Sequence, residues 1–336
     1  MSKLQEAKQA AAEKLLSLNR PGNVVGVGIG KKSVKGQPTS IDCLRIYVVS
    51  KLDRGHVRPA ELVPQDFLGI PTDVIQIGPL GRMGRTPKPR GDDIPVHSGQ
   101  GHFQPPRPGS PIRADTVAPN VNSGARGTLG MVVADGNQRH ILSCNHILAV
   151  NGRVLEDRKA NVVSAEFVNK EEPIAKPGVF VPLSRDGDNF VDCALAQIKE
   201  VDNVDAAFPS RVGKLNTPDP IPPECDMEVQ KLGAATGATE GTIVDISADL
   251  YVNYDFGTFR FANQVVIDGG RDDEEFATEG DSGSVVWDQK AKQAVAMVFA
   301  ASGRYAVACP LPKVLDLLKA RIPKGANRYA TLKLVI

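Results

Sequence analysis

The 336-residue sequence predicts a mainly β protein, with two small β-barrels preceded by a small α+β N-terminal module. The contents of glycine (32) and proline (25) favour turn-rich β structure over a helical protein. From Gly127 onward, short runs of β-forming residues alternate with polar turns, as is typical of small barrels. One segment with apolar residues at helical spacing, Pro312–Arg321, closes this run.

Composition and charge argue against several classes of protein. The net charge of +1 comes from well-mixed charges, which gives no reason to expect a nucleic acid or an anionic membrane as a partner. No apolar run reaches the length of a membrane span, and the charged N-terminus lacks the apolar core of a signal peptide. Five widely spaced cysteines without a C-x-x-C pair indicate neither a zinc cluster nor a disulfide framework. We therefore expect a reduced, cytoplasmic protein without cofactor or metal.

The first 78 residues predict the α+β module. Apolar residues spaced by three and four between Leu4 and Leu18 indicate an amphipathic helix that ends before Pro21-Gly22. Segments rich in Val and Ile predict strands at Asn23–Ile29, Cys43–Val49 and Asp73–Ile77. A short helical piece is expected near Pro59–Leu62. Such a module could mediate assembly into a homo-oligomer.

Gly26-Val27-Gly28-Ile29-Gly30 superficially suggests a dinucleotide-binding loop. The spacing is not Gly-x-Gly-x-x-Gly, and the polar stretch that follows does not begin an apolar helix. A phosphate-binding loop aided by Lys31 and Lys32 is one alternative. We favour a strand whose glycines permit close packing, followed by a solvated basic turn.

Residues 79–123 predict a linker, because nine of the prolines fall there. Pro105-Pro106-Arg107-Pro108 could be a polyproline ligand, but a stiff connector is the simpler interpretation. The first barrel is then expected at 124–205, the second barrel with its closing helix at 206–321, and a C-terminal extension at 322–336. Within the second barrel, separate strands are expected at Gly241–Ile246, Leu250–Asp255, Gly257–Phe261 and Gln264–Ile267.

The most distinctive stretch is Thr278–Trp287, which contains Gly280-Asp281-Ser282-Gly283. A serine between glycines, followed at once by β-formers, fits a nucleophile on a tight turn leading into a buried strand. Gly280 lacks a Cβ, so a substrate carbonyl can approach the backbone closely. The N–H groups of Gly280 and Ser282 could then stabilise an oxyanion. The alternative is a polar turn between two strands.

A serine nucleophile needs a base and a group that orients the base. Thr128–Ala134 and Gln138–Ser143 predict a hairpin that leads directly to His146, the only histidine that follows a buried-looking strand. Asp192 precedes a small, apolar run ending at Ile198. A carboxylate entering an apolar strand is costly unless its charge is satisfied, and a histidine N–H is a suitable partner. The alternatives are a structural histidine and a backbone-capping aspartate.

The order His146, Asp192, Ser282 makes the sequence resemble the chymotrypsin-like (trypsin-fold) serine proteases over roughly residues 127–320. Three motifs carry the resemblance: Leu142-Ser143-Cys144-Asn145-His146, Val191-Asp192-Cys193-Ala194-Leu195 and Gly280-Asp281-Ser282-Gly283. A segment at Lys231–Thr242 and the N-terminal module also resemble the plant narrow-leaf type proteases and their bacterial relatives.

The resemblance implies a chymotrypsin-like double β-barrel with its active site in the cleft between barrels. It implies a serine endopeptidase acting on protein or peptide substrates, in which Ser282 attacks, His146 transfers protons and Asp192 orients the imidazole. The backbone of Gly280 and Ser282 would form the oxyanion hole.

The family pattern also defines a specificity pocket. Phe276 takes the place that is acidic in trypsin, and Phe299, Ala300 and Ala301 end the strand that should wall the pocket. Both features favour a small or apolar substrate side chain. In trypsins the aspartate before the serine pairs with a new N-terminus, but no Ile-Val-Gly-Gly start occurs near Gly127, so the sequence leaves the partner of Asp281 open.

Two other functional hypotheses remain at this level. A protease-fold scaffold or binding protein, latent or non-catalytic, could engage a partner through the N-terminal module and the linker. An esterase or other acyl hydrolase is disfavoured, because the serine does not lie in a Gly-x-Ser-x-Gly elbow.

Overall fold

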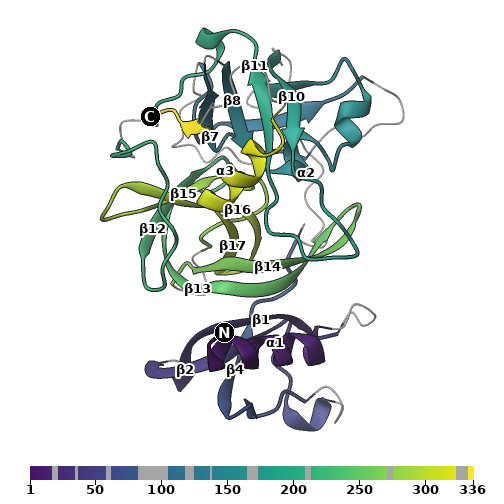
Figure 1. Ribbon diagram of the computed structural model, residues 1–336, viewed down its shortest axis with the longest axis vertical. Coiled ribbons are helices and arrows are strands. Elements are labelled where there is room, and N and C mark those ends of the chain that lie inside the picture. Colours follow the sequence, from purple (N-terminus) through teal and green to yellow (C-terminus); the bar gives the residue numbers. More distant parts are fainter. Residues whose placement is uncertain are drawn as a thin grey trace.

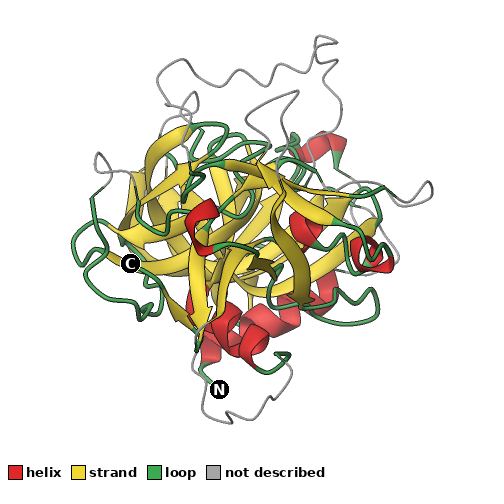
Figure 2. Ribbon diagram, turned by 90° about the horizontal axis from the view of Figure 1, so that it is seen from above, coloured by secondary structure: helices red, strands yellow, loops and turns green. Residues whose placement is uncertain are grey.

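The computed structural model describes residues 1–16, 22–34, 37–57, 62–81, 105–117, 125–136, 138–164, 173–208, 213–270, 275–322 and 332–336. It is mainly β, with two curled sheets, one of which extends into a small α+β module at the bottom of the view (Figure 1). Strands are also the prevailing secondary structure when the molecule is seen from above (Figure 2). The predicted fold class, a double β-barrel with an N-terminal α+β module, is thereby confirmed.

The module has one helix against a short sheet. Its elements are α1 (Lys3–Leu15), β1 (Val24–Val34), β2 (Gln37–Val48), a 3₁₀ turn (Arg54–His56), β3 (Asp66–Phe67) and β4 (Ile70–Gln76). Ser2 and Gln5 cap the start of α1 reciprocally, which satisfies two backbone N–H groups. The helix buries Ala7, Ala11 and Leu16 against Val27 and other apolar side chains of the sheet. The helical piece expected near Pro59–Leu62 lies mostly outside the described residues.

Glycines on one face of β1 bring the module against the second barrel. A Cβ on Gly26 would lie 2.2 Å from Leu250 Cδ2, and one on Gly28 would lie 1.8 Å from Asp245 Oδ2. These glycines therefore permit close packing, as predicted. Because β1 also pairs with β13 at Gly26–Leu250, the module and the second barrel share a ten-stranded sheet.

The other sheet has eight strands and forms the first barrel. Its members are β5 (Pro111–Asp115), β6 (Gly127–Thr128), β7 (Met131–Asp135), β8 (Gln138–Ser143), β9 (Asn161–Ser164), β10 (Pro173–Phe180), β11 (Ala194–Ile198) and β18 (Lys333–Leu334). Short helical turns follow β8 and β11: α2 (Asn145–Leu148), Arg153–Glu156 and Val201–Asn203. The sheet begins inside the stretch expected to be a linker, since β5 pairs with β9. It also recruits β18 from the expected C-terminal extension.

The second barrel contains the longest strands. They are β12 (Glu228–Gly233), β13 (Gly237–Tyr254), β14 (Gly257–Asp268), β15 (Val285–Asp288), β16 (Gln293–Ser302) and β17 (Tyr305–Pro310), followed by α3 (Leu311–Lys319). The sequence predicted separate strands at Gly241–Ile246, Leu250–Asp255, Gly257–Phe261 and Gln264–Ile267. That division was wrong, because β13 and β14 continue through register shifts at Asp245, Ala248 and Leu250.

Among the described residues, no helix is long and apolar enough to cross a membrane. The five cysteines are free thiols, of which Cys225 is exposed and the others are buried.

Candidate active site

His146 lies in the first turn of α2, where the end of β8 places it. Ile141 and Leu142 of β8 are fully buried, and the following Asn145 anchors α2 by donating to Val181 O at 2.8 Å. A Cβ on Gly127 would lie 2.6 Å from Ile147 Cγ1 and 2.9 Å from Ser282 O. Gly127 therefore allows α2 and the Ser282 turn to approach each other.

Asp192 is fully buried just before β11 and faces His146. The ring Nδ1 of His146 lies 2.6 Å from Asp192 Oδ2, and the His146 backbone N–H donates to Oδ1 at 3.2 Å. Burial by itself raises the pKa of the Asp192 carboxyl, but the adjacent His146 and the hydrogen bonds from His146 and Tyr254 bring this pKa below its usual value. The carboxylate is thus charged and can hold the imidazole in one orientation.

Tyr254 was not predicted from the sequence. Its hydroxyl donates to Asp192 Oδ2 at 2.7 Å, and its ring centroid lies 5.2 Å from that of His146. Burial and the nearby Asp192 raise the pKa of Tyr254 well above its usual value, so the hydroxyl remains a donor. The ring stacks on Phe256 across the end of the β13–β14 hairpin. Proximity of a hairpin tip to Asp192 depends on long-range packing, for which the local sequence carries no signal.

Ser282 sits on a tight turn with glycines at positive φ on both sides. Gly280 has φ +103° and Gly283 has φ +98°, which L side chains rarely adopt. Thr128 of the first barrel fixes the turn, since its hydroxyl donates to Gly280 O and its N–H donates to Ser282 O, both at 2.8 Å. Among the residues that the structure describes, no group accepts from the backbone N–H of Gly280 or Ser282. Two backbone donors beside the serine thus remain available.

The serine hydroxyl is bonded to a backbone carbonyl. Ser282 Oγ donates to Phe299 O at 3.4 Å rather than to His146. Phe299 packs on Phe261, with ring centroids 4.6 Å apart, and Phe261 contacts Tyr254. The three predicted residues therefore lie in one region of packed side chains, although the serine–histidine hydrogen bond is not formed.

Lys231 is the partner of Asp281 that the sequence did not reveal. Lys231 Nζ lies 3.4 Å from Asp281 Oδ2, and both side chains are fully buried. Asp281 also accepts hydrogen bonds from the N–H groups of Ala235, Thr236 and Thr278 at 2.9–3.1 Å. Burial lowers the pKa of Lys231, while the Asp281 carboxylate opposes that shift. A cation within the chain thus stabilises the conformation of the serine turn.

No protein-family model and no curated protein sequence matches the chain. Solved structures do resemble it at low identity. A glutamic acid-specific serine protease is 14% identical with a TM-score of 0.45, over 68% of this chain and 100% of its own. Thermobifida fusca protease A is 18% identical with a TM-score of 0.43, over 68% of this chain and 97% of its own. Cellulomonas bogoriensis chymotrypsin is 16% identical with a TM-score of 0.41, with the same coverage.

The neighbours in structure are chymotrypsin-like serine proteases. The similarity between this chain and these proteases is a similarity of fold.

The residues expected to form the specificity pocket occupy two environments. Phe276 is fully buried in an apolar cluster with Val229, Ile243 and Val298. Lys231 Nζ lies 5.9 Å from the centroid of its ring. Phe299 and Ala300 of β16 are also buried, whereas Ala301 is partly exposed. The Phe276 side chain thus fills space inside the barrel.

One group of side chains near the site has the composition of a metal site. The donor atoms of Cys144, His146 and Asp192 lie within 4.8 Å of one another. Burial raises the pKa of the Cys144 thiol well above its usual value, and its Sγ donates to Val298 O at 3.3 Å. A cysteine binds a metal as the thiolate, and the raised pKa keeps the Cys144 thiol protonated. The three residues are therefore better described as a histidine–aspartate pair beside a buried thiol than as a metal site.

Proposed function

We propose that this protein is a serine endopeptidase that hydrolyses peptide bonds through Ser282, His146 and Asp192. The 2.6 Å contact between His146 Nδ1 and the fully buried Asp192 carboxylate carries the proposal. A buried aspartate aligned on a histidine beside a serine turn is the arrangement that proton transfer from a serine requires.

In the proposed reaction, Ser282 Oγ rotates from Phe299 O toward His146 Nε2 and attacks the substrate carbonyl. His146 takes the serine proton and gives it to the leaving amine, which forms an acyl-enzyme. Water then attacks the acyl carbon, with His146 again accepting and returning a proton. Asp192 stabilises the transient imidazolium without being protonated itself.

The Gly280 and Ser282 N–H groups provide the electrostatic part of the proposed mechanism. Both lack acceptors among the described residues. Donors held ready for a developing oxyanion need no reorganisation during the reaction, and one such donor is typically worth about 10²–10³ in kcat.

The free edge of β16 supports a peptide as the substrate. β15 pairs with β16 only as far as Met297, and β17 occupies the opposite edge from Ala296 to Ser302. Among the described strands, none pairs with the edge of Phe299–Ser302 that faces away from β17. An extended peptide can add to such an edge through backbone hydrogen bonds, whatever its side chains.

The Lys231–Asp281 pair suggests that the site assembles without processing. A carboxylate that already has a buried cation within the chain needs no new N-terminus. The mature conformation of the serine turn is therefore accessible to the intact chain.

A latent or non-catalytic protease-fold scaffold is the second candidate. One observation favours it, because Ser282 Oγ is bonded to Phe299 O and not to His146. A scaffold would keep this arrangement, whereas an enzyme must leave it when substrate binds.

Peptide hydrolysis by the purified protein and its site variants tests the proposal. Ser282→Ala or His146→Ala should lower kcat by on the order of 10⁶, and Asp192→Asn by roughly 10⁴. Retention of near-full activity in Ser282→Ala would exclude the mechanism. A folded wild-type protein without turnover of peptides would favour the scaffold.

A further inference from the structure

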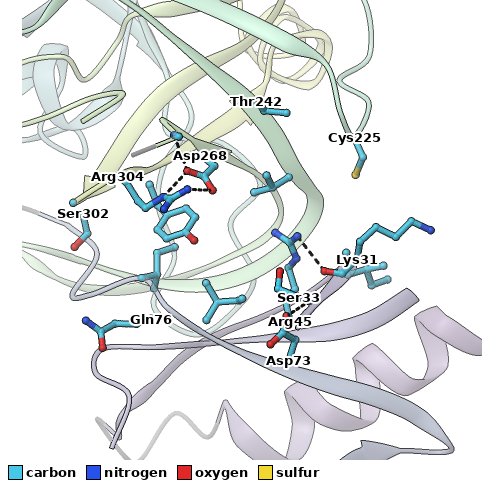
Figure 3. A pocket seen from close by; sticks show the side chains of 18 of the residues that line it. Lys31, Ser33, Arg45, Asp73, Gln76, Cys225, Thr242, Asp268, Ser302 and Arg304 are labelled. Carbon is cyan, nitrogen blue, oxygen red and sulfur yellow. Dashed lines mark hydrogen bonds and ion pairs between the residues drawn. The ribbon is translucent and has the colours of Figure 1, made fainter. Parts of the chain in front are cut away.

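A large cavity separates the N-terminal module from the second barrel (Figure 3). It has a volume of about 1270 Å³. Its floor is the face of β1, β2 and β4 that points away from α1, represented by Arg45 and Asp73. The rim of the second barrel, with Thr242, Asp268 and Ser302, forms the opposite wall. The volume exceeds the 300–1,000 Å³ typical of small-molecule sites, so it can hold several residues of polypeptide.

The charges in the cavity balance. Of the described residues that line it, four are lysine or arginine and four are aspartate. Two ion pairs account for half of them: Lys31 Nζ lies 2.6 Å from Asp42 Oδ1, and Arg304 contacts both oxygens of Asp268 at 2.6 and 2.8 Å. A site for a phosphate or a nucleotide would carry excess positive charge. A polar lining without net charge fits the alternating donors and acceptors of a peptide backbone.

The edge of β16 that has no partner among the described strands leads from Ser282 to this cavity. Phe299 O accepts from the Ser282 hydroxyl, and three residues further along the strand Ser302 lines the cavity. At a rise of about 3.3 Å per residue, this distance is roughly 10 Å. The module meets β16 at the same place, because a Cβ on Gly78 would lie 2.4 Å from Ser302 Oγ.

We propose that the cavity between the N-terminal module and the second barrel binds the substrate segment on the amino side of the scissile bond. A peptide paired antiparallel to β16 runs from Ser282 past Ser302, so its fourth to sixth residues before the cleaved bond enter the cavity. This inference rests on the proposed peptidase function. The N-terminal module then helps to select substrates, and it favours those that carry a polar, uncharged segment at these positions.

Two coumarin amides of different length test the proposal: acetyl-Ala-Ala-Ala and acetyl-Ser-Gln-Thr-Ala-Ala-Ala. The longer one should have a kcat/KM higher by on the order of tenfold, because remote binding energy lowers the barrier to the transition state. Cys225 lines the cavity and is the exposed cysteine, so fluorescein maleimide can be attached there without a mutation and obstruct the cavity. Labelling should remove the advantage of the longer peptide. Cys225→Ser protein treated identically should keep it.

Calorimetric titration of the two peptides into full-length Ser282→Ala measures binding to the cavity without hydrolysis. It therefore tests the cavity site independently of the proposed peptidase activity. Tighter binding of the longer peptide that is lost on labelling supports the cavity site, even if neither amide is hydrolysed by the wild type. Failure of both amides to react would count against the peptidase. Equal kcat/KM and equal affinity for the two lengths, or an advantage that survives labelling, would overturn the cavity site.

Discussion

Lys231 Nζ lies 3.4 Å from Asp281 Oδ2 in the interior of the second barrel, and neither side chain is exposed to solvent. The pair ties β12 to the residue just before Ser282. It explains how the serine turn can be ordered by the chain's own residues.

Replacing Lys231 by Met should destabilise the protein by about 3–5 kcal/mol, because it leaves the Asp281 carboxylate buried without a cation. Urea unfolding measures the loss. The double variant Lys231→Met/Asp281→Asn should recover part of it, since no charge then remains buried. The solvent-facing variant Lys290→Met serves as the control. An unchanged free energy of unfolding in Lys231→Met would contradict a structural role for the pair.

Replacing Tyr254 by Phe should lower kcat by about 10–100-fold. The change removes one hydrogen bond to a charged carboxylate, worth about 1.5–3 kcal/mol. Tyr251→Phe is the matched control, because Tyr251 lies on the same strand and donates to Leu16 O at 3.2 Å, away from His146. Peptide turnover and thermal unfolding are compared for both variants. Equal losses of kcat in the two would show that Tyr254 has no special part in orienting Asp192.

The stability of the protein should depend on pH through Asp245. This fully buried carboxyl packs against Gly28 and accepts hydrogen bonds from Tyr47 OH at 2.8 Å and Ile29 N at 3.0 Å. Burial raises its pKa from 3.8 to about 6. The folded state therefore binds the proton more tightly than the unfolded chain. The resulting stabilisation is fully present below pH 3.8 and is lost as the pH rises through about 6.

The shift corresponds to about 3 kcal/mol. Unfolding by urea at several pH values from 4 to 8 should show this loss in the wild type and not in Asp245→Asn. The difference in unfolding free energy between the two proteins isolates the contribution of this carboxyl. Parallel pH profiles for the two would contradict a raised pKa.

Local sequence was sufficient to predict the fold class and several elements. Alternation of β-formers predicted the β7–β8 hairpin, and helical spacing predicted α1 and α3. The glycines at 26, 28 and 30 predicted close packing; β13 is the close neighbour of Gly26 and Gly28, and Arg45 of β2 is that of Gly30. His146 and Asp192, chosen because each borders an apolar strand, meet at 2.6 Å. In each case the signal lies within a few residues of the feature.

Features that join distant parts of the chain were not predicted. Tyr254 reaches Asp192 across 62 residues, and Lys231 reaches Asp281 from another strand. Neither residue type is unusual where it stands, so only the folded arrangement reveals the pair. The division of β13 into two strands failed for a related reason. The predicted strands end at Ile246 and begin again at Leu250, but the partner strand β14 continues the pairing through the irregularity between them.

In the proposed function, Ser282 is a nucleophile activated by His146. Labelling with a fluorophosphonate at neutral pH, followed by mass spectrometry of the modified peptide, tests it most directly. Ser282→Ala and His146→Ala proteins are treated in parallel. We expect stoichiometric modification confined to Ser282 in the intact, unprocessed wild type, and none in either variant. A folded wild-type protein that is not labelled, or is labelled equally in His146→Ala, would contradict it.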